Sequence, residues 1–272
     1  MCFYWEPVEN SSTGEMTLDE ARKLSEKMPP FFWLLIGGGE PFVRKDLAKI
    51  VKYFYDNNGI RHVSIPTNAT YGDQIIEQVT EMLTACPDLF LNLNLSLNGL
   101  GKEYDELVQT PGAFDKFLST YQRVAELKKT LKNLGLGLNL THSKYNQEGL
   151  NKIIDFVVQD LPAIDNISLG LVRGRPKETG ALNVDLKYYK SVVQRIENYA
   201  VQKKIRSFQT VLGGIAFTKD MIMRRGIAKT VEKGFQIPCL AGKISLVIDE
   251  KLNVYPCEML SSVGNLRQTD YD

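Results

Sequence analysis

Two stretches of the chain alternate between leucine and small or polar residues, and this pattern predicts two strands of one β-sheet. Leucine occupies every second position from 89 to 97 and again from 134 to 140. Because successive side chains of a strand point to opposite faces, each stretch has a leucine face and a face of asparagine, serine, threonine or glycine. We expect the leucines to pack against helices. The polar faces would then line a hollow, which is costly unless it is wet or holds a polar ligand.

Segments with helical periodicity separate these two strands from three others. Further strands are expected at 31–36, 61–66 and 167–173, and helices at about 17–27, 45–57, 73–85, 113–132, 147–159 and 186–203. A chain in which strands alternate with helices favours an α/β fold with a parallel sheet. The alternative is an antiparallel sheet with one solvated face, which the intervening helices disfavour.

The apolar run at 31–36, which we expect to be a buried strand, ends in the turn Gly37-Gly38-Gly39-Glu40-Pro41. Glycines at the carboxyl end of a strand let the backbone approach a ligand closely, and Pro41 biases Glu40 towards extended geometry. A carboxylate held there suits an ammonium group, in a charge-assisted bond worth roughly 1.5–3 kcal/mol. The alternatives are a plain turn with a solvated glutamate, or a phosphate-binding glycine loop.

Composition narrows the class of protein. The 272 residues include 33 basic and 32 acidic ones, a net charge of +1, which gives no electrostatic case for nucleic acid or an anionic membrane surface. No apolar run approaches the roughly 20 residues that span a bilayer. Four cysteines do not make a secreted disulfide framework. We therefore expect a soluble protein of a reducing compartment, the cytoplasm.

Five short motifs occur in a fixed order and together resemble the radical S-adenosylmethionine (radical SAM) enzymes over nearly the whole chain. That family opens with C-x-x-x-C-x-x-C, and Cys2, which aromatic residues follow, is similar to its last cysteine. The other two would lie before Met1, so we expect the natural chain to extend beyond both ends of this one. The motifs are Cys2-Phe3-Tyr4-Trp5, Gly38-Gly39-Glu40-Pro41, Thr67-Asn68-Ala69, Ser96-Leu97-Asn98-Gly99 and Thr110-Pro111-Gly112-Ala113-Phe114.

The resemblance implies a TIM-like partial (β/α)6 barrel over residues 1–204, with its first strand missing, and a helical connection at 205–236. It also implies a [4Fe–4S] cluster that cleaves S-adenosylmethionine to a 5′-deoxyadenosyl radical, which abstracts a substrate hydrogen. By motif, Cys2 is a cluster ligand, and the ammonium is held by the turn that contains Gly38, Gly39, Glu40 and Pro41. The residues implied near the methionine carboxylate, ribose or adenine are Thr67, Asn68, Ser96, Asn98, Asn139 and Arg173.

The carboxyl end carries a second resemblance. Residues 237–272, with Cys239, Cys257 and an expected hairpin at 244–249 and 253–255, look like the start of a SPASM or twitch extension. This implies an auxiliary iron–sulfur cluster, although Leu252 occupies the usual glycine position. The two cysteines could instead be core thiols or half of a zinc site.

Departures from the family pattern concern substrate contacts more than the family itself. Asn98 replaces the usual aspartate, Ala69 the usual glycine, and Tyr104 a frequent histidine. His142 is a candidate substrate contact at a strand end. The expected substrate is a peptide, a protein or a small metabolite, with a reducing partner such as flavodoxin or ferredoxin. The alternative is a barrel without a cluster that binds a nucleotide or another small ligand.

Overall fold

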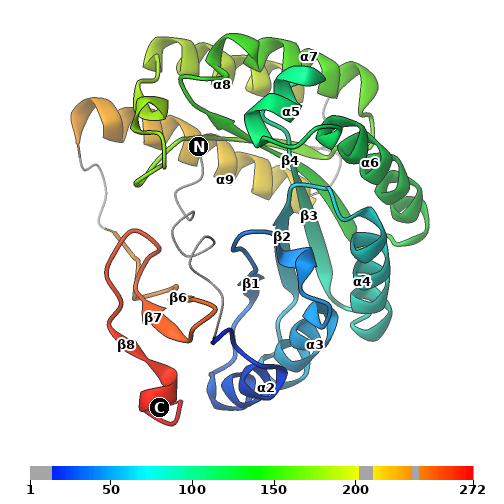
Figure 1. The fold of residues 1–272 in the computed structure, drawn as a ribbon, viewed down its shortest axis with the longest axis vertical. Helices are drawn as coiled ribbons and strands as arrows, with labels where there is room; N and C mark the ends of the chain where they lie inside the picture. Colours follow the sequence, from blue (N-terminus) through cyan, green and yellow to red (C-terminus); the bar gives the residue numbers. More distant parts are fainter. Residues whose placement is uncertain (1–13, 202–210, 235–238, 272) are drawn as a thin grey trace.

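The computed structural model describes residues 14–201, 211–234 and 239–271, and the side chains of 211–221 lie outside this description. Its centre is a curled sheet of five parallel strands that follow one another in chain order (Figure 1). The parallel α/β half-barrel confirms the fold class that the alternating pattern and the resemblance imply. The strands are β1 (Trp33–Leu35), β2 (His62–Thr67), β3 (Phe90–Ser96), β4 (Leu134–His142) and β5 (Asn166–Leu171).

Helices connect the strands and cover the outer face of the sheet (Figure 1). Thr17 and Glu20 form the expected capping box that begins the first of them, and Gly59, at φ 68°, ends the next. The α-helices are α2 (Leu18–Lys27), α3 (Leu47–Asn58), α4 (Gly72–Ala85), α5 (Lys102–Val108), α6 (Ala113–Thr130), α7 (Leu150–Asp160), α8 (Leu186–Val201) and α9 (Val211–Lys233); the 3₁₀ turns are η1 (Pro41–Val43), η2 (Gln147–Gly149) and η3 (Thr179–Leu182). None of the described helices is long and apolar enough to cross a membrane.

The sheet register places all the expected leucines on one face. Leu93 of β3 lies beside Ile65 of β2 and Leu136 of β4, and all three are fully buried. The opposite face carries Asn94 beside Gly137. The prediction that the leucines pack outwards is therefore confirmed, and the polar and small residues lie on the opposite, inner face of the curled sheet, which is called the hollow below.

The strand at 31–36 differs from the prediction. Only Trp33–Leu35 pair as β1, and within the described residues this strand has a single neighbour, β2. Trp33 is 45% and Leu35 65% exposed, because β1 lies at the edge of the sheet and both residues face the hollow side. The apolar run at 31–36 was interpreted as a strand buried on both faces. This was wrong for the inner face of β1, where Trp33 and Leu35 are exposed.

A small antiparallel sheet follows α9 near the carboxyl end. It contains β6 (Val247–Ile248), β7 (Asn253–Tyr255) and β8 (Gly264–Asn265), with the turn η5 (Leu266–Gln268) after it. The expected hairpin is confirmed as the β6–β7 pair, and β8 adds a strand that was not predicted. The proposed division of the chain at 204 and 236 stays a prediction, since both boundaries lie outside the described residues.

Candidate functional site

The glycine turn after β1 leaves backbone open to solvent. Gly38 has φ +122°, a conformation that residues with a side chain rarely adopt. No heavy atom lies within 4 Å of the point where a Cβ would stand at Gly37 or Gly38. Pro41, in contrast, is buried at the start of η1. The turn therefore has accessible backbone groups, and the buried Pro41 that follows it holds it in place.

The carboxylate of Glu40 joins the ends of β1 and β2. Its Oε1 accepts a hydrogen bond of 2.8 Å from the Thr67 hydroxyl, and its Oε2 accepts one of 2.8 Å from the Asn68 N–H. The Phe42 N–H donates a third bond, of 3.2 Å, to Oε1. Burial raises the pKa of Glu40 above its ordinary value, and the three hydrogen bonds act in the opposite direction. Two oxygens can accept about four bonds, so one acceptor direction is left for a ligand.

Tyr104 fixes the ends of β2 and β3. Its hydroxyl donates to the Ser96 carbonyl at 3.1 Å and lies 3.5 Å from the Asn68 carbonyl, and burial raises the pKa of this phenol to about 12. A neutral phenol at ordinary pH is therefore a structural donor. The sequence pointed to Tyr104 only as a replacement for histidine. In the structure its ring packs against Phe114 and Phe117, with 6.2 Å between ring centroids in each pair, so it is a core residue.

Asn98 connects the ends of β3 and β4. Its Oδ1 accepts a bond of 2.7 Å from the Thr141 N–H, and its carbonyl accepts one of 3.1 Å from the Asn146 amide. Asn146 also donates to the Thr141 carbonyl at 2.8 Å. The Asn98 amide nitrogen has no partner among the described residues and could bind a ligand, whereas an aspartate at this position would offer only acceptors.

Ser96 and Asn139 face the hollow beside each other, in register with Ser168 of β5. All three side chains are half-buried, and none makes a hydrogen bond with the described part of the chain. Polar groups that are half-buried and unpaired need water or a ligand. The expected residues Glu40, Thr67, Asn68, Ser96, Asn98 and Asn139 are thus gathered at the carboxyl ends of neighbouring strands.

Below these strand ends, glycines of β4 make room for amides. A Cβ at Gly137 would lie 2.3 Å from Asn94 Oδ1 and 2.9 Å from Asn166 Oδ1. A Cβ at Gly135 would lie 2.9 Å from Asn92 Oδ1. The Asn92 amide in turn donates to Asn94 Oδ1 at 2.9 Å. The glycines predicted to face the hollow are therefore required by the size of their neighbours.

An aromatic row crosses the amino end of the hollow. The Trp33 ring meets His62 edge-on with 5.2 Å between ring centroids, and His62 stacks on Phe90 at 5.4 Å. Trp33 Nε1 donates to the Ser64 hydroxyl at 3.1 Å. The hollow thus has a polar wall and an aromatic end.

Two other candidate residues have contacts outside this group. Arg173, expected at the cofactor, forms an ion pair with Glu258 of the carboxyl-terminal segment. His142 was considered a substrate contact, but it continues the leucine face of β4, where its buried ring lies 5.6 Å from the Tyr189 ring. The two-residue alternation from Leu134 already placed it there, so the strand's period should have decided against a role in the hollow.

The cysteine predictions are not tested. Cys2 lies outside the described residues. Cys239 is exposed and Cys257 half-buried, and both are free thiols. Within the described residues, no group of three or more His, Cys, Asp or Glu side chains could hold a metal ion. Both proposed clusters therefore stay predictions.

Comparison with known proteins identifies relatives of the whole chain. The model of the Radical SAM superfamily matches residues 1–156. The AdoMet-dependent heme synthase of Methanosarcina barkeri is 26% identical over 268 residues, which cover 95% of this chain and 72% of that protein. The mycofactocin maturase MftC of Mycolicibacterium smegmatis is 27% identical over 228 residues, which cover 83% of this chain and 52% of the maturase.

A solved structure of anSMEcpe with bound AdoMet and a Cp18Cys peptide has a similar fold. Its TM-score is 0.57 at 18% identity, over 98% of this chain and 72% of that one. Identity at this level supports the fold alone. The similarity covers the half-barrel and the small carboxyl-terminal sheet together, because nearly all of this chain is aligned.

Proposed function

The chain belongs to the radical SAM superfamily, and we propose that S-adenosylmethionine binds across the carboxyl ends of β1 to β4. The observation that carries this proposal is the set of unpaired polar groups gathered there. Ser96 and Asn139 have no partner in the described part of the chain, and the Gly37–Gly38 backbone is open. A zwitterionic nucleoside supplies ammonium, carboxylate and hydroxyl groups that match this mixture of donors and acceptors.

Each group has a place in the proposal. The ammonium would lie at the glycine turn, bound by backbone oxygens and by the remaining acceptor direction of Glu40. The ribose and the methionine carboxylate would lie along Asn68, Ser96, Asn98 and Asn139, whose amides and hydroxyls can both donate and accept. Arg173 belongs to this set only if its pair with Glu258 opens.

We propose Cys2 as one ligand of a [4Fe–4S] cluster. Such a cluster, when bound, supplies the electron that splits the sulfonium and yields a 5′-deoxyadenosyl radical. The task of the chain's own residues is to orient the nucleoside and to exclude water from the hollow. The aromatic row of Trp33, His62 and Phe90 would contribute to this second task at the amino end of the hollow.

The proposal extends to the class of substrate and to the electron donor. A peptide substrate is favoured, since a solved structure of the same fold holds a peptide together with AdoMet. A small metabolite remains the second substrate class, and a flavodoxin- or ferredoxin-like protein would supply electrons. Cys239 and Cys257 would contribute to an auxiliary iron–sulfur cluster.

The test is anaerobic reconstitution of protein expressed from the complete gene, followed by an assay for 5′-deoxyadenosine after reduction with dithionite. We expect release of 5′-deoxyadenosine that depends on cluster loading. Binding of the nucleoside without its cleavage in cluster-loaded protein would instead favour a barrel that binds a ligand without radical chemistry.

Glu40 provides the sharper test of the site. We expect Glu40→Ala to weaken S-adenosylmethionine binding roughly 10- to 100-fold, the equivalent of one charge-assisted hydrogen bond, with the cluster intact. Glu81→Ala, on the exposed surface of α4, is the matched control. Thr67→Val removes one partner of Glu40 and keeps the carboxylate, so it separates ligand contact from positioning. Equal affinity in the Glu40 variant and the control would remove Glu40 from the site.

A further inference from the structure

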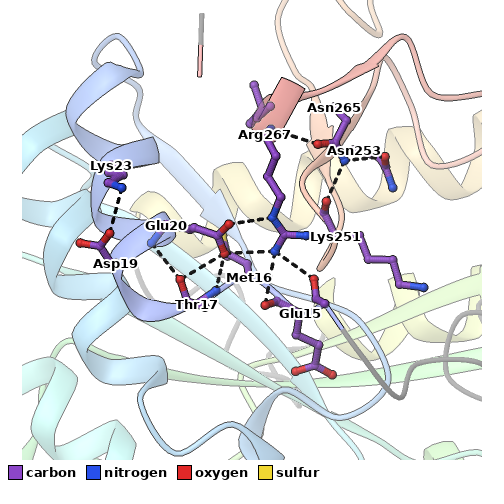
Figure 2. Close-up of polar contacts among 12 residues, drawn as sticks. Glu15, Met16, Thr17, Asp19, Glu20, Lys23, Lys251, Asn253, Asn265 and Arg267 are labelled. Atoms are coloured by element: carbon purple, nitrogen blue, oxygen red, sulfur yellow. Dashed lines mark hydrogen bonds and ion pairs between the residues drawn. The ribbon is translucent and has the colours of Figure 1, made fainter. Parts of the chain in front are cut away.

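The carboxyl-terminal sheet and the start of α2 meet through a dense set of polar contacts. Figure 2 shows Arg267 reaching from η5 to Glu20 and to the backbone of Glu15. These partners lie nearly the full length of the chain apart. The contact therefore joins the last described element to the first.

Arg267 is held on both sides of the contact. Its Nε donates to Glu20 Oε1 at 2.7 Å and its Nη2 to Glu20 Oε2 at 3.0 Å, a two-bond pairing that the planar guanidinium fork of arginine favours. The backbone N–H of Arg267 donates to Asn265 Oδ1 at 3.0 Å, and the side-chain amide of Asn265 donates to the Lys251 carbonyl at 2.8 Å. Arg267 is thus fixed to the β6–β8 sheet before it reaches α2.

Four hydrogen bonds hold the backbone of Gly14 to Met16, including the one of 3.5 Å from Arg267 Nη2 to the Glu15 carbonyl. Arg267 Nη2 donates to the Gly14 carbonyl at 2.9 Å, and the Met16 N–H donates to the Glu250 carbonyl at 2.6 Å. From the barrel side, Arg44 Nη1 donates to the Met16 carbonyl at 2.7 Å. This segment is therefore fixed between the carboxyl-terminal sheet and the residue that follows η1.

Arg44 connects this segment with the glycine turn. It lies one residue after η1, whose first residue, Pro41, follows Glu40 directly. The Arg44 side chain pairs with Asp46 at 2.7 Å, and its carbonyl accepts a bond of 2.9 Å from the Gln78 amide. Residues 40–46 thus form a short, firmly held loop with Glu40 at one end and the contact to Met16 near the other.

We propose that Arg267 is a positioning residue for the cofactor site: through Gly14–Met16 and Arg44 it holds the loop that presents Glu40. The carboxyl-terminal sheet is then an integral part of the S-adenosylmethionine site. This inference rests on the proposed function, since it concerns the same site.

The contacts that carry this role are stronger than ordinary surface ion pairs. The side chains of Arg267 and Glu20 are 35% and 19% exposed. Besides its two bonds to Glu20, Arg267 donates a hydrogen bond to the backbone carbonyl of Gly14. An exposed pair such as Arg173 with Glu258, whose side chains are 58% and 38% exposed, adds little by comparison. Leu252 is fully buried beneath the small sheet, and Leu266 and Tyr271 pack against the same core, so the sheet has an apolar base on which Arg267 can act.

The experiment measures S-adenosylmethionine affinity by calorimetry on anaerobically reconstituted protein from the complete gene. We expect Arg267→Ala to weaken binding roughly three- to tenfold, and Arg267→Lys to recover part of the loss, because lysine keeps the charge but not the fork. Arg22→Ala is the matched control, since Arg22 lies on α2 and, within the described residues, its side chain pairs with Asp19 and Glu26 of that helix. The cluster absorption spectrum and the thermal midpoint of each variant are recorded alongside.

A double-mutant cycle separates positioning from general loss of stability. If Arg267 acts through Arg44, the affinity lost in Arg267→Ala/Arg44→Ala is smaller than the product of the two single losses. Independent effects, or an Arg267→Ala affinity within twofold of wild type with the cluster loaded, would overturn the proposal. Absence of binding in the wild-type protein would instead refute the proposed function, so the two failures are distinguishable.

Discussion

The two faces of the five-stranded sheet are built from the same strands but differ in composition and packing. The outer face is a continuous layer of buried leucine, valine and isoleucine against the helices. The inner face carries asparagines, serines and glycines, and the half-buried side chains of Ser96, Asn139 and Ser168 have no hydrogen-bond partner in the described part of the chain. A close-packed face gains stability from every methylene, whereas a face with unpaired polar groups gains little and can bind ligands. Stability and proposed function are therefore separated by the two-residue period of a strand.

The largest expected effect tests the apolar face. Leu93 is fully buried, and Leu93→Ala should lower the free energy of unfolding by about 2–5 kcal/mol, measured by urea denaturation. Ser168→Ala, on the inner face, should change it by less than about 0.5 kcal/mol, because that hydroxyl has no hydrogen-bond partner among the described residues. Similar losses in both variants would contradict the separation of the two faces.

The next effect concerns the space kept by glycine on the inner face. Gly137→Ala places a methyl group 2.3 Å from Asn94 Oδ1, so Asn94 must move, at a cost of about 1–3 kcal/mol. Gly170→Ala is the control on the same face, since its Cβ would meet no atom within 4 Å. Equal unfolding midpoints would show that the amides beside Gly137 adjust freely.

His142 is the polar exception on the apolar face, and it predicts a pH dependence. Burial lowers the pKa of His142 below 6.5, while the Gln147 side chain and the charge of Asp185 oppose the shift. Because the unfolded chain binds the proton first, the free energy of unfolding should fall below pH 6.5, by at most about 1.4 kcal/mol per pH unit down to the folded-state pKa. In His142→Leu that decline should be smaller than in the wild type, and equal slopes would refute the assignment.

The smallest effect concerns the end of β2. Ala69 is buried at φ +63°, a left-handed conformation that costs an alanine about 1–2 kcal/mol. Ala69→Gly removes this strain, but it loses about 0.8 kcal/mol from burial of the methyl group. It also stabilises the unfolded state by about 0.4–1 kcal/mol, because glycine gives the unfolded chain more conformational freedom. The free energy of unfolding should therefore change by less than about 1 kcal/mol.

Gly59→Ala is the control for Ala69, because it introduces the same strain at φ +68° with no contact in reach and should destabilise by about 1 kcal/mol. A loss above 2 kcal/mol in Ala69→Gly would show that the Ala69 methyl group matters more than its backbone.

The sequence predicted the helices and strands well, because strand alternation and helix capping depend on residues that are close together in the chain. The alternation from 134 to 141 became β4 (Leu134–His142), and the capping box at Thr17 begins α2 as expected. The error at 31–36 arose because an apolar run does not say whether a strand has one neighbour or two. The gathering of Glu40 with Thr67 and Asn68 followed from the rule that parallel strands end at one edge.

Pairings between distant segments were beyond the sequence. Nothing local to Arg173 indicates Glu258, and nothing local to Arg267 indicates Glu20. Both are charged residues in exposed segments, for which a solvated side chain is the default expectation. Tyr104 was noticed only as a substitution, because its two carbonyl partners belong to other strand ends.

The bond between Glu20 and Arg267 joins residues 247 positions apart. On a ribosome that adds about 5–20 residues per second, roughly 12–50 s would pass between the synthesis of these two side chains. The strands and their helices can assemble one after another during that interval, since each pairs with its neighbour in sequence. The contact between Arg267 and Glu20 can form only after the carboxyl-terminal segment has been made, so α2 lacks this partner until then.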